Sequence, residues 1–130
     1  MSGIPDEAGV LYRLARQDRL AYQTLLANPD IDFRIVGFHA QQAVEKALKA
    51  VLVAYGVIFP PTDNLLKLAD LLLDRKISLP IPPKVLAGLN PYAVVFRYDG
   101  REPHTLDREG VLEIVSAVFA WADTHFLEMK

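Results

Sequence analysis

An arginine and a histidine lie close together in the most polar stretch of the sequence, which runs from Arg97 to His104. Six residues separate the two. Histidine can transfer protons near neutral pH, and arginine can hold a developing phosphorane charge through two parallel hydrogen bonds. Such a pair is suited to cleaving an RNA phosphate without a metal ion. The same spacing is also typical of a surface loop before a helix, so both interpretations stay open.

A second group of polar residues recurs at intervals of three and four residues, the spacing of one helix face. Two lysines and a histidine within it are able to receive phosphate oxygens, which predicts a face that binds an anion or a partner. The alternative is a solvated face on which Glu45 and Lys49 form an ion pair. The members of this polar stripe are His39, Gln42, Lys46 and Lys49.

Several other chemistries find little support in the sequence. The chain contains no cysteine, which excludes disulfides, thiol nucleophiles and thiolate metal ligands. Its three histidines, His39, His104 and His125, show no metal-ligand spacing, and we expect neither a metal nor another cofactor. There is no glycine-rich phosphate loop, no G-x-S-x-G motif and no distinctive carboxylate pair for glycoside hydrolysis.

Length and composition predict one domain spanning residues 1–130. A chain of 130 residues with 52% hydrophobic and 23% charged residues can bury a core and is not of the disordered type. The net charge of -2 excludes a uniformly basic nucleic-acid-binding coat but not a local basic stripe. No signal peptide is visible, and no apolar run approaches the ~18 residues of a membrane span. We therefore expect a cytoplasmic protein without a membrane role.

The first of five expected helical segments covers residues 6–27 and has an apolar arc that we expect in the core. A carboxylate, Asp18, interrupts this arc and must be paired or hydrogen-bonded there. The arc comprises Val10, Leu11, Leu14, Ala21 and Leu25, and the opposite side carries Tyr12, Arg16, Arg19 and Gln23.

The second segment begins at Asp30 or Asp32 and ends at Tyr55, before a glycine suited to terminating a helix. The third, residues 64–74, is expected to have Thr62 or Asp63 as its cap. The fourth, residues 83–98, should break at Asn90-Pro91. The expected core stripe of the second segment is Phe33, Ala40, Val44, Ala47, Leu48, Val51 and Tyr55, and that of the third is Leu65, Leu66, Leu68, Leu72 and Leu73.

The last segment begins after Asp107, its expected N-cap, with Leu106 packed on Val111 as a hydrophobic staple. Amphipathic helices joined by short connections predict an all-α fold, a single up-and-down antiparallel helical bundle of four to five helices. The buried stripe expected on the last helix is Val111, Val115, Val118, Phe119, Ala122 and Phe126.

Three segments resemble the HEPN family, the higher-eukaryote and prokaryote nucleotide-binding domain. The run from Phe38 to Ala50, FHAQQAVEKALKA, closely resembles the family's second-helix signature. Residues 16–20, RQDRL, look like its first helix with the acidic residue, and Arg97-Tyr98-Asp99 resembles the Arg-Tyr-Pro-Asp end of its fourth helix without the proline. The chain departs from the family at residues 62–65, where TDNL stands in place of Thr-His-Asp-Leu.

The resemblance, over about residues 11–126, implies a helical bundle that usually dimerises. Many members are encoded beside, or fused to, a minimal nucleotidyltransferase, as a toxin–antitoxin module. Active members are metal-independent endoribonucleases with an Arg-(four to six residues)-His motif, which Arg97 and His104 fit at the upper limit, and two motifs face each other across the dimer axis. Asp18 is then expected to pair with Arg97 or Lys46.

Three functions follow from this resemblance. In one, the chain binds a nucleotide or docks a nucleotidyltransferase, with Lys46 and Lys49 on phosphate and with Gln42 and Tyr98 orienting base or sugar. In another, it is an endoribonuclease toxin acting on RNA. In the third, it is a non-catalytic interaction module whose polar stripe is a homodimer contact. The expected site residues are Arg97 and His104 for catalysis, His39, Gln42, Lys46, Lys49 and Tyr98 for nucleotide or phosphate binding, and Asp18, Glu45 and Asp99 in support.

Overall fold

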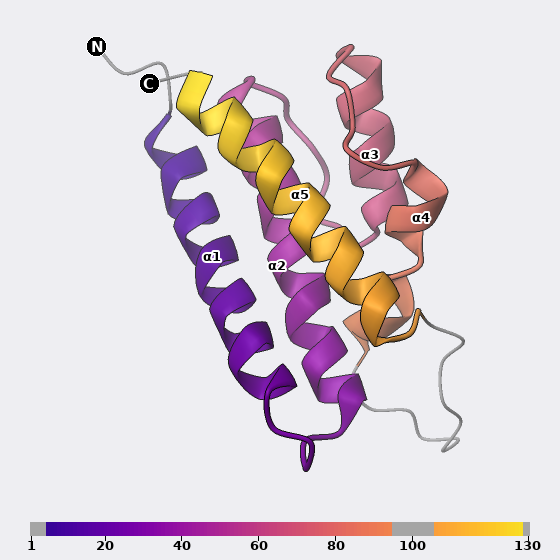
Figure 1. The fold of residues 1–130 in the computed structure, drawn as a ribbon. Coiled ribbons are helices and arrows are strands. Elements are labelled where there is room, and N and C mark those ends of the chain that lie inside the picture. Colours follow the sequence, from indigo (N-terminus) through magenta and orange to yellow (C-terminus); the bar gives the residue numbers. More distant parts are fainter. Residues whose placement is uncertain (1–4, 95–105, 129–130) are drawn as a thin grey trace.

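Helix α2 (Phe33–Ala54) lies at the centre of the structure, a computed structural model that describes residues 5–94 and 106–128. Helix α1 (Asp6–Leu26) packs along it as the other arm of an antiparallel hairpin, and α5 (Arg108–Glu128) crosses it (Figure 1). Helix α3 (Leu65–Asp74), α4 (Pro83–Ala87) and the 3-10 helix η1 (Asn90–Ala93) lie to one side. No strand occurs in the described ranges, so the predicted all-α helical bundle is confirmed.

The boundaries of α2 and α5 follow local signals that the sequence displays. Asp32 is the N-cap of α2, where its side chain accepts a hydrogen bond from the Arg34 N–H, and Gly56 ends the helix with a φ of 73°. Asp107 accepts a hydrogen bond from the Gly110 N–H at 2.8 Å and starts α5. The predicted starts of both helices are confirmed.

Helices α2 and α5 supply most of the core. The whole stripe predicted for α5 is buried, and so are the alanines, valines and leucine predicted for α2. Tyr55 is an exception, since it is 40% exposed at the end of α2 and bonds to His125 instead of entering the core. By length and composition alone, Arg108–Leu127 is apolar enough to cross a membrane, a test that core helices of soluble proteins also pass.

The face of α1 that enters the core is rotated from the predicted one, although Leu11 and Leu25 of the predicted arc still pack against the core. Val10 and Leu14 are 44% and 45% exposed, whereas Tyr12 and Tyr22 are buried. Tyr12 stacks on Phe126 with ring centroids 4.4 Å apart, and its hydroxyl bonds to Asp123. Burial raises the pKa of Tyr12, and the bond to Asp123 adds to this effect. The helix is rotated because two tyrosine rings remove more apolar surface from water than Val10 and Leu14 would.

The third predicted segment starts later than expected, and the fourth is divided into two short helices, α4 and η1. Asn64, not Thr62 or Asp63, is the N-cap of α3, and its side chain accepts from the Leu66 N–H at 3.0 Å. Leu66 and Leu73 are exposed, while the other three predicted leucines of α3 are buried. The fourth segment ends as an α-helix at Ala87 and resumes as η1 at Asn90, since Pro91 favours the first turn of a new helix.

Candidate functional site

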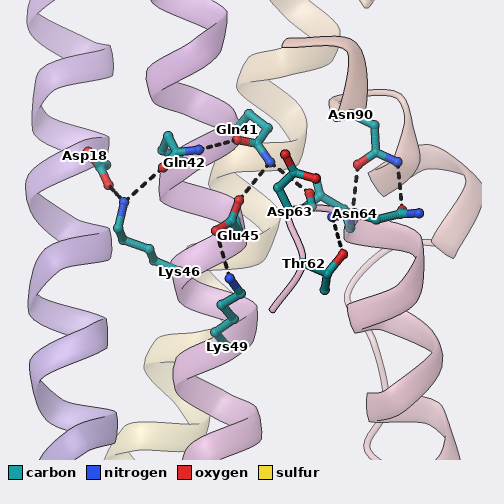
Figure 2. Close-up of polar contacts among 11 residues, drawn as sticks. Asp18, Gln41, Gln42, Glu45, Lys46, Lys49, Thr62, Asp63, Asn64 and Asn90 are labelled. Atoms are coloured by element: carbon teal, nitrogen blue, oxygen red, sulfur yellow. Dashed lines mark hydrogen bonds and ion pairs between the residues drawn. The ribbon is translucent and has the colours of Figure 1, made fainter. Parts of the chain in front are cut away.

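The polar stripe on α2 starts with an ion pair to α1. Lys46 Nζ lies 2.6 Å from Asp18 Oδ2, and it also donates to Gln42 Oε1 at 3.2 Å (Figure 2). The interruption of the α1 arc by Asp18 is explained by this pair. Of the two partners predicted for Asp18, the structure brings Lys46 to it, whereas Arg97 lies outside the described residues.

Two glutamines continue the chain of hydrogen bonds from this ion pair toward α3. Gln42 Nε2 donates to Gln41 Oε1 at 2.8 Å. Gln41 Nε2 donates at 3.2 Å both to Glu45 Oε1 and to the backbone carbonyl of Asp63, just before α3 (Figure 2). Glu45 Oε2 then accepts from Lys49 Nζ at 3.0 Å, which confirms the predicted pair of Glu45 and Lys49. We call these connected side chains, Asp18, Gln41, Gln42, Glu45, Lys46 and Lys49, the α2 network.

The α2 network is partly removed from water. Gln41 has no exposed surface and Glu45 is 8% exposed, while the lysine side chains and Asp18 keep a quarter or less of theirs. Two lysines and two carboxylates balance in charge, so the network satisfies itself electrostatically, as buried charges require. An anion that binds there must therefore compete with Asp18 or Glu45 for a lysine.

The network is anchored to a second cluster of amides at the start of α3. Asn90 Oδ1 accepts from the Leu65 N–H at 2.9 Å, and Asn90 Nδ2 donates to Asn64 Oδ1 at 3.1 Å (Figure 2). Gln41, Asn64 and Asn90 were not predicted as site residues. Gln41 carried a usable signal, because an amide at a core position of a helix needs hydrogen-bond partners.

His39 does not join the α2 network, although it belongs to the predicted stripe. Its ring lies edge-on to Phe38 with centroids 5.4 Å apart, and its Nδ1 is buried without a hydrogen-bond partner among the described residues. The predicted site residues Arg97, Tyr98, Asp99 and His104 lie outside the described residues. The structure therefore brings together Asp18, Gln42, Glu45, Lys46 and Lys49.

A comparison with family models decides the relationship of this chain to known proteins. The model described as "HEPN domain" matches residues 8–125. The chain belongs to the HEPN domain family. HEPN is a family of the nucleotide-binding or RNase type, and this general class therefore applies to the chain. A search of curated proteins and a search of solved structures each found no match.

In this HEPN domain the α2 network is built from the signature segment FHAQQAVEKALKA, together with Asp18 of the RQDRL segment. Two of the three segments that carry the resemblance thus meet in space, at Asp18 and Lys46, which are 28 residues apart in the chain. Over residues 5–94 and 106–128, no group of three or more His, Asp or Glu side chains is arranged to hold a metal ion.

Proposed function

We propose that this HEPN chain binds a nucleotide and acts as the partner subunit of a minimal nucleotidyltransferase in a toxin–antitoxin-type module. The observation that carries the proposal is the α2 network, in which Lys46 and Gln42 stand side by side on the HEPN signature helix. Both residues are only partly buried, so both can reach a ligand at the surface.

In this proposal a nucleotide phosphate takes the place of the Asp18 carboxylate on Lys46. A phosphate oxygen accepts from an ammonium group as a carboxylate oxygen does, and it carries more charge. Gln42 offers both a carbonyl and an NH₂ group, which suits it to orienting base or sugar. Lys49 and Tyr98 complete the proposed contacts, with Glu45 holding Lys49 in place.

Substitution of the two members of the Asp18–Lys46 pair should change nucleotide affinity in opposite directions. Lys46→Gln removes the phosphate-binding charge, and we expect ATP or AMP binding to weaken about tenfold. Asp18→Asn removes the competing carboxylate, and we expect binding to strengthen about threefold. Isothermal titration calorimetry with the purified chain measures both affinities.

The opposite signs separate ligand binding from a structural role. If the pair only stabilises the fold, both variants lower the stability of the protein, and Asp18→Asn does not strengthen nucleotide binding. Lys67→Gln, on an exposed position of α3, is the matched control and should bind as the parent does. Absence of nucleotide binding by the parent would contradict the proposal and leave the interaction-module hypothesis.

The exposed apolar residues beside the network support a protein partner, and we propose a second copy of the chain. Val10, Leu14 and Ile35 are 44%, 45% and 41% exposed on the two helices that carry the network. A surface with apolar flanks and balanced charges can be self-complementary, as a two-fold dimer requires. Sedimentation equilibrium of the purified chain gives its mass directly.

A second candidate function is metal-independent RNA cleavage by Arg97 and His104. Its structural support is the connection between the two ends of the segment that contains them. The Tyr92 hydroxyl, in η1, donates to the Leu106 carbonyl at 2.9 Å. The chain thus enters and leaves this segment at neighbouring points.

The cleavage hypothesis predicts an activity that resists chelators and depends on both residues. With total cellular RNA and excess EDTA, His104→Ala and Arg97→Ala should each reduce the cleavage rate at least a hundredfold. Gel analysis of the RNA over time measures these rates. Intact RNA with the parent would favour the binding subunit, and cleavage that survives both substitutions would exclude these two residues as the site.

A further inference from the structure

A basic pocket opens at the other end of the bundle from the α1–α2 loop, where α2, α3 and α5 end. Its volume is about 400 Å³. The residues that line it are Tyr55, Arg75, Lys76, Ile77, Ser78 and His125. None of them belongs to the α2 network or to the segment from Arg97 to His104. The pocket therefore has no role in the function proposed above.

The lining of this pocket contains two cationic side chains and no carboxylate. Arg75 and Lys76 are both exposed. This contrasts with Lys46 and Lys49 in the α2 network, which are each bonded to a carboxylate. It also contrasts with the pocket beside Tyr12, whose lining contains both Arg16 and Asp123. The side chains that line the pocket at the end of α3 thus carry a net positive charge, which favours an anion.

Lys76 has an unusual backbone conformation at this site. Its φ is 60°, the only positive value at a non-glycine position in the described residues. It occupies the left-handed position of a helix-ending motif, in which its N–H donates to the Leu73 carbonyl and the Ile77 N–H donates to the Leu72 carbonyl. The equivalent position after α2 is Gly56, with the same pattern of hydrogen bonds around it.

A lysine at this position costs conformational free energy that glycine would not. The chain uses glycine in the matching motif at the end of α2, so the motif itself does not demand a side chain. The carbonyls of Leu72 and Leu73 are occupied by backbone N–H groups, so Lys76 is not needed to satisfy them. Strained backbone positions cluster at binding sites, and this one lines a pocket.

The remaining donors in the pocket are held in position by their neighbours. The Tyr55 hydroxyl and His125 Nδ1 are 2.8 Å apart, which links the ends of α2 and α5. Trp121 lies edge-on to His125 with centroids 5.0 Å apart, and its indole N–H donates to the Ser78 carbonyl at 2.7 Å. These contacts hold the end of α2, helix α5 and the connection after α3 together at the pocket, which lowers the entropy cost of binding.

We propose that this pocket binds the phosphate group of a small phosphate monoester, such as a sugar phosphate. The Arg75 guanidinium can hold two phosphate oxygens at once, and the Lys76 ammonium adds a second positive charge. The volume exceeds what a phosphate group needs and leaves space for a sugar-sized substituent next to the Tyr55 and His125 side chains.

The fluorescence of Trp121 can report binding at this pocket. Trp121 is the only tryptophan in the sequence and contacts His125 of the pocket. We expect its fluorescence to change in a saturable manner on titration with inorganic phosphate and with ribose 5-phosphate at constant ionic strength. Ribose and sodium chloride serve as the neutral and ionic controls. Tighter binding of ribose 5-phosphate would assign a sugar contact, and equal binding would assign the phosphate group alone.

Lys76→Gly separates the proposed site from an accidental cluster of charges. Glycine removes the charge and relieves the strained backbone, so we expect phosphate affinity to fall about tenfold while the melting temperature without phosphate rises by about 3 °C. Arg75→Gln should weaken phosphate binding to a similar extent. Lys67→Gln, on α3 but outside the pocket, should change neither quantity.

Two results would overturn the proposal. One is a parent protein whose Trp121 fluorescence shows no saturable response to phosphate or ribose 5-phosphate. The other is a Lys76→Gly variant that keeps the affinity of the parent. Lys46→Gln, in the α2 network, should leave the Trp121 response unchanged, so this proposal and the proposed nucleotide site fail or succeed separately.

Discussion

Gly37→Ala is expected to lower the free energy of unfolding by about 1–3 kcal/mol, because a methyl group there overlaps the ring of Tyr92. A Cβ atom on Gly37 would lie 2.8 Å from Tyr92 Cγ and closer still to two other ring carbons. The ring has little freedom to move away. It is 3% exposed, lies edge-on to Phe33 and is tied through its hydroxyl to the Leu106 carbonyl.

Urea denaturation followed by circular dichroism measures this loss. Gly9→Ala is the matched control, since Gly9 is an exposed position of α1 with nothing within 4 Å of an added Cβ. There alanine should stabilise the helix by about 0.5–1 kcal/mol. Because alanine is expected to destabilise the protein at Gly37 and to stabilise it at Gly9, the comparison isolates the effect of the overlap with Tyr92. A Gly37→Ala variant as stable as the parent would mean that α2 and η1 do not approach each other this closely.

Gln41→Leu is expected to destabilise the protein by about 1–3 kcal/mol, although leucine is apolar and has a similar volume. Gln41 has no exposed surface, and its amide joins three polar groups. Leucine would leave the Asp63 carbonyl, Glu45 Oε1 and the Gln42 amide without these bonds. Two of these partners, Glu45 and Gln42, have roles in the proposed nucleotide site, so nucleotide affinity should fall as well.

Gln42→Leu is the comparison for this effect, because Gln42 is only partly buried and water can replace its bond to Lys46. We expect it to cost less than half as much as Gln41→Leu when both are measured by urea denaturation. Equal losses at the two positions would show that burial of the Gln41 amide is not what makes it important.

Features that depend on neighbours within a helical turn could be predicted from the residues alone. Asp32, Asp107 and Gly56 act at helix ends as their residue types predict. The pair of Glu45 and Lys49 also follows from local spacing, because residues four apart share a helix face. The buried stripe of α5 was predictable because its members recur at intervals of three and four residues.

The tertiary structure alone decided which face of α1 enters the core. Two faces compete on this helix, one with Val10 and Leu14 and one with Tyr12 and Tyr22. Spacing within α1 cannot rank them, because the gain from burying a tyrosine depends on finding a ring such as Phe126 and a hydroxyl partner such as Asp123.

The candidate sites divide in the same way. The stripe of polar residues on α2 is visible in the sequence, but its bonds to Asp18 and to the Asp63 carbonyl depend on how α1 and α3 pack against it. The basic pocket depends on packing even more, because Tyr55, Lys76 and His125 come from the ends of three different elements. Helical periodicity relates residues three or four apart, whereas a site between helices depends on the rotation and crossing of each helix, which only the packed core determines.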